Sequence, residues 1–479
     1  MANILLIDTN TTPFNEAFPV YPIGLDYLQG AIAGAGLGDC QILDLTRLGG
    51  ALAPQDLRRR GGLSLELIKR ALGARAWDVV GLSLRNIDST YPVLEGQEGL
   101  HYYLPQLLAY LDAVAAHAAP DTRVILGGTG FSIMPQAFLA GRPDTWHGVV
   151  GPGETAFVEL LQSLAAGKTP PRLIRGLPTL LGALGNADLL GQYLELPVGE
   201  STFGLRSKVG CGQACGYCPY PLINGPRQRL KEPERVAAEV AFLAQVHARH
   251  AARPPLRFMF ADDIFNRPLE HAKAVLKAIL AHGCRPDSWH AYLDPSSLDQ
   301  EFLELVLASR GWSRPSEPGQ TGPGFMFFPF DIESGSDRML KNLRKPYDSA
   351  GLLTAVDLYR RVTGQAVARG ELAGAEFGFH LLLGYPGEDE QSVAETCRLI
   401  NQARPAQIAV QLGVRVYPGT PLAQAVAGQL WRREEDLHQP VFVRADREQI
   451  LGWLRQYLHA DYDRLARRGN MLMIGRGQD

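Results

Sequence analysis

Cysteine is scarce in this chain, and so are the features that mark secreted or membrane-spanning proteins. The 479 residues include six cysteines, far fewer than a disulfide-stabilised scaffold of this size needs. No run of about 18 apolar residues occurs, so no membrane span is expected. The opening residues, MANILLIDTN, lack the basic and long apolar regions of a signal peptide. Together these absences predict a cytoplasmic location, where thiols stay reduced.

An excess of charge of one sign is lacking as well. The 47 lysines and arginines stand against 50 aspartates and glutamates, which gives a net charge of −3. This balance gives no support for a nucleic acid or an acidic membrane as the main partner. The hydrophobic content of 46% and the charged content of 20% are ordinary for a globular protein with a large core. The length favours two to three domains.

Residues 1–165 alternate short apolar runs with amphipathic helical patterns such as Leu104–His117. The predicted strands are Asn3–Ile7, Gln41–Leu45, Val79–Leu84, Arg123–Leu126 and Gly148–Val150. Strands that alternate with helices indicate a parallel sheet covered by helices on both faces. We therefore predict an α/β fold that begins with a doubly wound, Rossmann-like domain. Ligands of such sheets bind beyond the carboxyl ends of the strands.

Residues 166–200 are rich in proline and glycine and are predicted to be a linker. Residues 201–420 repeat the strand–helix alternation six times, which predicts a partial (β/α)6 barrel whose chemistry lies at the carboxyl ends of its strands. Residues 421–479 are predicted to be a short helical C-terminal region, with one amphipathic helix over Glu448–Arg468. A solvated cap and a cover over a substrate site are the two interpretations of that helix.

Half of the cysteines fall in one short stretch, KVGCGQACGYCPY, directly after the first predicted barrel strand. Cys211, Cys215 and Cys218 have the spacing Cys-x3-Cys-x2-Cys. Zinc sites usually take four ligands, yet no fourth cysteine is near and no histidine lies between Lys208 and Val246. Three thiolates suit a [4Fe-4S] cluster that keeps one iron open for a small molecule. The remaining cysteines are predicted to be plain buried residues: Cys40, Cys284 and Cys397.

This spacing, with the aromatic Tyr217 just before the last cysteine, resembles the radical S-adenosylmethionine (SAM) superfamily. Further segments with the pattern of that superfamily are FADDIFN (260–266), DIESGSDRMLKNL (331–343), LLLGYPGED (381–389) and VYPGTPLA (416–423). The resemblance implies that the three cysteines hold the cluster. It also implies a set of SAM-binding residues: Tyr217, Asp262, Asp263, Glu333, Ser334, Gly384 and Tyr417. From the residues alone, the two aspartates and Ser336 also fit helix N-caps.

Three loops of the first domain resemble the cobalamin-binding class of the same superfamily: YPIGLDYL (21–28), ILGGTGFS (125–132) and VVGPGETAF (149–157). Glycines in such loops allow the backbone to approach a buried ligand, and the helix that opens at Glu154 offers free N–H groups. The cobalamin-binding residues that the resemblance implies are Gly24, Ser83, Arg85, Asn86, Gly127, Gly128, Gly130, Gly151, Gly153 and Glu154.

The chain departs from that class in two places. The loop after the first strand has no histidine, so it cannot supply the cobalt ligand found in many cobalamin domains. Arg85 stands where an apolar residue would lie near the lower face of the corrin. A guanidinium does not ligate metals, and its charge would disfavour a ligand opposite the methyl group. This resembles the cobalamin-dependent tryptophan methylase branch, although a surface pair with Asp88 also accounts for Arg85.

The resemblance implies a cobalamin-dependent radical SAM methyltransferase. Methyl would pass from SAM through methylcobalamin to carbon or phosphorus of a small-molecule, lipid or peptide substrate, with an external one-electron reductant. The implied cofactors are a [4Fe-4S] cluster, SAM and cobalamin. The alternatives are a non-methylating rearrangement or cyclisation, a non-catalytic sensor, and a tRNA-modifying enzyme, which the charge balance disfavours. Catalytic residues stay unidentified. Aromatic candidates belong either to the cavity or to the core: His290, Tyr292, Phe327, Phe328 and Tyr417.

Overall fold

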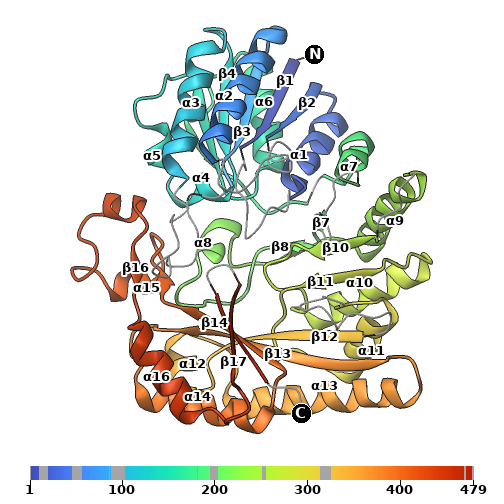
Figure 1. Cartoon of the computed structure of the whole chain (residues 1–479). Helices are drawn as coiled ribbons and strands as arrows, with labels where there is room; N and C mark the ends of the chain where they lie inside the picture. Colours follow the sequence, from blue (N-terminus) through green and yellow to red (C-terminus); the bar gives the residue numbers. More distant parts are fainter. Residues whose placement is uncertain are drawn as a thin grey trace.

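The computed structural model shows two α/β units that lie one above the other, with the short helix α8 (Tyr220–Asn224) between them (Figure 1). The N-terminal unit is the blue and cyan part of Figure 1, and the barrel follows below it in green to orange. The structure describes residues 2–9, 20–45, 57–85, 87, 103–180, 182–194, 203–250, 255–312, 325–468 and 471–476.

The N-terminal unit is built on a parallel sheet of six strands in the order β2-β1-β3-β4-β5-β6. The order reverses between β1 and β3, which creates the crevice where doubly wound sheets bind ligands. The strands are β1 Ala2–Asp8, β2 Gly38–Asp44, β3 Val79–Ser83, β4 Arg123–Gly127, β5 Trp146–Val150 and β6 Leu173–Arg175. The helices are α1 Ile23–Gly34, α2 Leu57–Ala74, α3 Leu104–His117, α4 Thr129–Ile133, α5 Pro135–Leu139 and α6 Glu154–Ala165. The predicted Rossmann-like sheet is confirmed.

Both faces of this sheet are buried, because alternate residues of each strand point to opposite sides. Ile4 and Leu6 of β1 pack in a cluster with residues of α1 and α6. Leu5 and Ile7 pack in a second cluster with residues of α2, α3, α4 and α5. This explains why the strands read as continuous apolar runs in the sequence.

Part of the segment predicted as a linker is structured. β6 pairs with β5 and so becomes the last strand of the first sheet. The helix α7 (Ala187–Leu194) buries Leu190 and Tyr193, which pack in the core of the barrel unit. The segment therefore closes one domain and contacts the next.

In the described part of the barrel unit, six parallel strands form two groups. β7 (Phe203–Leu205) pairs with β10 (Arg257–Phe260), which pairs with β11 (Ser288–Ala291). In the second group, β12 (Phe325–Glu333) pairs with β13 (Gly374–Leu383), which pairs with β14 (Gln407–Leu412). The helices are α9 Pro233–Arg249, α10 Leu269–Ala281, α11 Gln300–Ala308, α12 Asp337–Asn342, α13 Ser349–Ala368 and α14 Glu390–Ala403.

Aromatic contacts join the two groups of barrel strands. The rings of Trp289 and Trp312 lie 5.0 Å apart, and those of Trp312 and Phe328 lie 4.9 Å apart. All three side chains are buried. The barrel thus has one continuous core, as the prediction of a partial (β/α)6 barrel requires.

The C-terminal region differs from the prediction of one helix over Glu448–Arg468. α16 spans only Arg447–Tyr457, and the chain then forms the antiparallel strands β17 (Arg464–Arg468) and β18 (Met471–Gly475). β18 pairs with β14, which would otherwise be the edge of the sheet. Edge pairing and the burial of Leu472 and Ile474 outweigh the helical propensity of the arginine-rich stretch. Shorter elements complete the region: α15 Pro421–Ala425, a 3-10 helix over Glu434–His438, and β16 Phe442–Val443, which pairs with β15 (Val414–Arg415) just before the region.

No helix in the described part of the chain has both the length and the apolar character needed to cross a membrane.

A buried polar cluster fixes the first domain against the barrel. The hydroxyl of Tyr27 (α1) donates to Glu239 Oε2 (α9) at 2.8 Å and accepts from the Arg206 backbone N–H at 3.1 Å. Lys231 Nζ lies 2.8 Å from Glu239 Oε1 and 4.4 Å from the centre of the Tyr27 ring. Tyr27, Lys231 and Glu239 are at most 3% exposed. We call these three residues the interdomain lock.

Breaking the lock on one side should destabilise the whole protein. Glu239→Ala leaves the Lys231 ammonium buried without its counter-charge, which costs about 3–5 kcal/mol. Tyr27→Phe removes the hydrogen bonds of the hydroxyl with Glu239 and with the Arg206 N–H, which costs about 2–4 kcal/mol in total. Urea unfolding followed by circular dichroism measures both changes. Arg369→Ala, which breaks an exposed pair with Glu371, is the control and should leave the midpoint unchanged. An equally small effect of Glu239→Ala would contradict this role of the lock.

Candidate functional site

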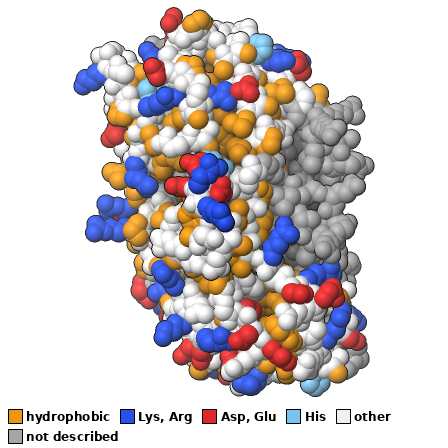
Figure 2. Space-filling view, turned by 90° about the vertical axis from the view of Figure 1, so that its left-hand side faces the viewer, with side chains coloured by type: hydrophobic (Ala, Val, Ile, Leu, Met, Phe, Trp, Pro, Cys, Tyr) orange, Lys and Arg blue, Asp and Glu red, His pale blue; other side chains and the backbone are white. Residues whose placement is uncertain are grey.

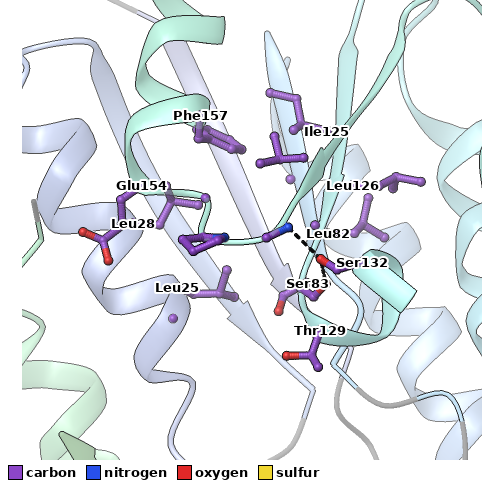
Figure 3. A pocket seen from close by; sticks show the side chains of 18 of the residues that line it. Leu25, Leu28, Leu82, Ser83, Ile125, Leu126, Thr129, Ser132, Glu154 and Phe157 are labelled. Atoms are coloured by element: carbon purple, nitrogen blue, oxygen red, sulfur yellow. Dashed lines mark hydrogen bonds between the residues drawn. The ribbon is translucent and has the colours of Figure 1, made fainter. Parts of the chain in front are cut away.

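A pocket lies where the carboxyl ends of the first sheet face the barrel. It encloses about 860 Å³ of space not filled by atoms, part of it open to solvent. Phe157 and Ile125 lie at one end, and Ser83 and Thr129 at the other (Figure 3). The apolar end lies against the middle of the strands, and the hydroxyls stand near the carboxyl ends of the strands, which face the barrel. A ligand would therefore enter from the barrel side with its apolar part first.

Glycines shape the pocket for two different physical reasons. Gly128 and Gly151 have φ values of +96° and +87°, which L side chains rarely adopt. A Cβ at either position would also lie within 2.7 Å of a backbone carbonyl oxygen. At Gly24, Gly127 and Gly153 the reverse holds, since a Cβ would meet no heavy atom closer than 3.8 Å. Protein packing therefore does not explain these three glycines, and their missing side chains leave room for a bound group.

Two polar side chains, Ser132 and Glu154, fix the loops at the rim of the pocket by hydrogen bonds. Ser132 Oγ donates to the Gly128 carbonyl at 2.8 Å and accepts from the Gly151 N–H at 2.9 Å, which joins the loops after β4 and β5 (Figure 3). Glu154 Oε2 accepts from the Gly182 N–H at 2.7 Å. Ser132 lies inside the quoted loop ILGGTGFS but was not among the predicted residues, because its role depends on a loop elsewhere in the chain.

Most of the residues predicted for cobalamin line this pocket: Gly24, Ser83, Gly127, Gly128, Gly151, Gly153 and Glu154. Gly130 does not line the pocket. A glycine is needed at this position because a Cβ would lie 3.0 Å from the Leu84 carbonyl oxygen. Arg85 is exposed and also lies outside the lining. Asn86 and Asp88 fall outside the described residues.

The barrel completes the pocket with three residues that sequence reasoning missed: Arg206, Ile223 and Asn224. Ile223 and Asn224 belong to α8, directly after the cysteine loop. A Cβ on Gly151 would lie 2.7 Å from the Ile223 carbonyl oxygen, so the two domains touch here.

The cysteine loop runs from β8 (Lys208–Val209) to α8, and β9 (Arg229–Leu230) pairs with β8 beyond it. Cys211 and Cys215 are buried and Cys218 is half-buried. Gly216 anchors the loop: its N–H donates to the Leu343 carbonyl at 3.0 Å and its carbonyl accepts from the Leu422 N–H at 2.8 Å. A Cβ on Gly216 would lie 2.3 Å from the Tyr385 hydroxyl oxygen. The segments after the fourth, fifth and sixth barrel strands thus all contact this one glycine.

Burial raises the pKa of all three thiols, that of Cys218 to about 12. Two buried lysines act in the opposite direction. Lys208 lies near Cys211, and Lys345 lies near Cys215. Burial lowers the pKa of Lys208 to about 8. Cations placed beside thiols favour the thiolate and offset the negative charge of any cluster bound there.

Tyr217 and Glu333, both predicted to bind SAM, lie together with Lys345. The Tyr217 hydroxyl donates to Glu333 Oε1 at 2.7 Å, and Lys345 Nζ lies 2.6 Å from the same oxygen. Burial alone would lower the pKa of Lys345, but Glu333 and Tyr217 raise it well above its usual range. Glu333 has a φ of +60°, a conformation that favours a functional or tightly constrained residue. Lys345 was missed because it follows the quoted motif by two residues.

The remaining predicted SAM residues have different surroundings. Asp262 accepts from the backbone N–H groups of Ser207 and Lys208 and from the Ser207 hydroxyl, so its carboxylate holds the start of the cysteine loop. Asp263 accepts from Asn224 Nδ2 at 3.1 Å, and its neighbours include Cys211 and Cys218. Neither aspartate caps a helix, since α10 begins at Leu269.

Three predicted residues sit in the framework around the loop. Ser334 is fully buried and its hydroxyl accepts from the Ser336 N–H. Gly384 has a φ of +93°, and a Cβ there would lie 2.5 Å from the Ala445 Cβ. Tyr417 packs in a hydrophobic cluster of the first domain, so the loop after the last barrel strand joins the two units.

The donor set fits an iron–sulfur cluster better than a single metal ion. Among the described residues, no three histidine, cysteine, aspartate or glutamate side chains are placed to hold one ion. A four-iron cluster takes each thiolate on a separate iron, so its ligands stand further apart than those of a lone ion. Three cysteines on one loop supply the three thiolates that such a cluster takes, and Lys208 and Lys345 place positive charge beside two of them. Of the other cysteines, Cys397 is buried as predicted, and Cys40 and Cys284 are half-buried.

The family model described as B12 binding domain matches residues 15–161 of the chain. A tRNA-2-methylthio-N(6)-dimethylallyladenosine synthase from Leifsonia xyli subsp. xyli is 27% identical over 46% of this chain and 37% of its own length. The ribosomal protein uS12 methylthiotransferase RimO from Desulfotalea psychrophila is 24% identical over 62% of this chain and 60% of its own length. The chain thus spans less than two thirds of these two curated relatives.

Two solved structures are similar to this chain over nearly its whole length. The radical S-adenosylmethionine methyltransferase TsrM from Kitasatospora setae, with tryptophan and a SAM analogue bound, has a TM-score of 0.67 at 21% identity. The match covers 90% of this chain and 76% of TsrM. The cobalamin-dependent S-adenosylmethionine radical enzyme OxsB, with aqua-cobalamin bound, has a TM-score of 0.66 at 13% identity, over 93% and 64% of the two chains. The N-terminal domain of this chain therefore matches the B12 binding domain model, and the chain has the overall fold of TsrM and OxsB.

Proposed function

We propose that the chain is a cobalamin-dependent radical SAM methyltransferase. The observation that carries this proposal is that the glycine-lined pocket and the cysteine loop are adjacent and share α8. Ile223 and Asn224 line the pocket, and Cys218 lies two residues before α8 begins. One bound group in the pocket and another on the loop would therefore face each other across the domain boundary.

In this proposal the pocket of the first domain holds cobalamin, and Cys211, Cys215 and Cys218 hold a [4Fe-4S] cluster to which SAM binds. Cobalamin supplies a cobalt that can accept and release a methyl group, and the cluster supplies one electron to SAM. An external one-electron reductant and a cytoplasmic location belong to the proposal.

In this proposal the side chains of the protein bind the cofactors and hold them in position. Asp263, with Asn224 beside it, is the carboxylate that remains available for the ammonium group of SAM, since Asp262 is engaged with the backbone. Lys345 holds Glu333 and Tyr217 in place beside Cys215. The lock and the contacts of Tyr417 keep the domains together and exclude water from the space between them.

We propose that the substrate binds near two exposed tyrosines, Tyr220 and Tyr292. Tyr292, Asp263 and Arg85 are near enough to the Tyr220 phenol to act on it electrostatically. These groups therefore lie close together between the domains. Of the other aromatic candidates, Phe328 and Tyr417 are buried in the hydrophobic core, and Phe327 is buried outside its clusters. We propose a small molecule with an aromatic or apolar part as the substrate.

On the face shown in Figure 2, basic and acidic side chains are interspersed, and the basic ones do not form an extended stripe. A face of this kind offers little for an RNA backbone. This face therefore gives no support for an RNA substrate such as the tRNA of the first curated relative.

Loss of any loop cysteine should abolish the cluster without unfolding the protein. Cys211→Ala, Cys215→Ala and Cys218→Ala, reconstituted anaerobically without cobalamin, should each bind less than a tenth of the iron and sulfide bound by the wild type. Chemical analysis and electron paramagnetic resonance measure this. Cys284→Ala, outside the loop, is the matched control. A loop variant that keeps the full cluster would show that the assignment of the three ligands is wrong.

The two kinds of glycine should respond differently to substitution. Gly151→Ala is strained by its positive φ and should lower the free energy of unfolding by about 1–3 kcal/mol. Gly153 has an ordinary φ, and there is open space where its Cβ would lie. Gly153→Leu should therefore unfold like the wild type, but its affinity for hydroxocobalamin should fall at least tenfold. Urea titration and equilibrium dialysis measure the two effects. Unchanged cobalamin binding by Gly153→Leu would place the ligand elsewhere.

Methyl transfer is tested with SAM that carries a trideuterated methyl group. The holoenzyme is incubated with a reductant and a panel of amino acids and indoles that starts with tryptophan. A product that gains the trideuterated methyl in the wild type but not in Cys218→Ala supports the proposal. A product without label would instead favour the non-methylating alternative. The yield of 5′-deoxyadenosine tells whether a radical route is used.

A further inference from the structure

Among the residues that the structure describes, Arg206 is the only cationic side chain in the lining of the pocket, and it comes from the barrel. In the same described lining, the only other ionisable side chain is Glu154, which already accepts from the Gly182 N–H. The guanidinium of Arg206 has no carboxylate within 4 Å among the residues that the structure describes. Asp263 is near enough for Arg206 to lower its pKa, against the larger effect of burial, but the two form no ion pair.

The backbone at Arg206 is held firmly on both sides. Its own N–H donates to the Tyr27 hydroxyl of the interdomain lock. The next residue, Ser207, donates its N–H to Asp262 at 2.9 Å. The side chain is half-buried. A guanidinium on a fixed backbone at the edge of a largely apolar pocket is preorganised for an anion, and its fork of N–H groups matches a phosphate.

We propose that Arg206 binds the phosphodiester of the nucleotide tail of cobalamin. This inference rests on the proposed function. The far end of the pocket, lined by Leu6, Ile125 and Phe157, suits a flat apolar ring such as the benzimidazole that ends this tail. The phosphodiester is the anionic group of the tail, and it lies between that ring and the corrin. It would therefore stand nearer to the pocket entrance, where the barrel contributes its residues.

A consequence is that the barrel selects for the complete corrinoid. Cobinamide has the corrin ring but lacks the phosphodiester, ribose and base. An arginine that acts on the phosphodiester strengthens the binding of cobalamin and leaves that of cobinamide unchanged, which separates this role from a general effect on the shape of the pocket.

The test measures the binding of hydroxocobalamin and of cobinamide to the full-length protein by equilibrium dialysis. Arg206→Ala should weaken hydroxocobalamin binding about 10- to 100-fold, as expected for a lost charge-assisted hydrogen bond, and change cobinamide binding less than twofold. Arg206→Lys keeps the charge but loses the forked pair of N–H groups. Its affinity for hydroxocobalamin should therefore lie between that of the wild type and that of Arg206→Ala. Arg229→Ala removes an exposed arginine of β9 and should bind both corrinoids like the wild type.

Four outcomes would overturn the inference. Hydroxocobalamin binding that is unchanged in Arg206→Ala excludes the contact. Equal weakening of both corrinoids shows an effect on shape, and urea unfolding of Arg206→Ala and Arg206→Lys tells whether misfolding is its cause. A loss of SAM affinity in the cluster-loaded protein, with corrinoid binding intact, assigns Arg206 to the carboxylate of SAM. If the wild type binds neither corrinoid, the proposed function itself fails, and the inference with it.

Discussion

The contact of Tyr27 with Glu239 and Lys231 determines where the first domain lies on the barrel. These side chains are buried, and burying charges has a large desolvation cost that only a close partner offsets. An apolar interface could have slid or tilted with little change in free energy. A hydrogen-bonded ion pair has one satisfactory geometry, so it fixes both the distance and the orientation of the two sheets. The pocket is lined by residues of both domains, so its shape depends on this fixed arrangement of the two sheets.

The same contact reaches the functional site through the backbone. Tyr27 belongs to α1, whose first turn contributes Gly24 to the pocket, and its hydroxyl also holds the N–H of Arg206. From there, Ser207 and Lys208 lead through the hydrogen bonds of Asp262 into the cysteine loop. A short path of covalent and hydrogen bonds thus connects the domain boundary with both candidate cofactor positions.

Much of the fold could be predicted from the sequence, because parallel strands buried on both faces leave a clear apolar signal. Leu104–His117 was predicted with both of its ends correct. The C-terminal hairpin was not predicted, since Arg464–Arg468 has no strand pattern of its own and takes that form by pairing. Likewise, the glycine loops and the cysteines could be recognised from local sequence. Arg206 and Lys345 could not, because their roles depend on residues more than a hundred positions away or on the opposite domain.

The anchoring of Gly216 determines when the cysteine loop can reach its final form. Its carbonyl is bound by the N–H of Leu422, and its Cα is packed against Tyr385. During synthesis the cysteines leave the ribosome long before either partner exists. The loop therefore stays incomplete until most of the barrel has been made. A cluster bound by these cysteines would therefore be inserted after the barrel has folded and would not guide its folding.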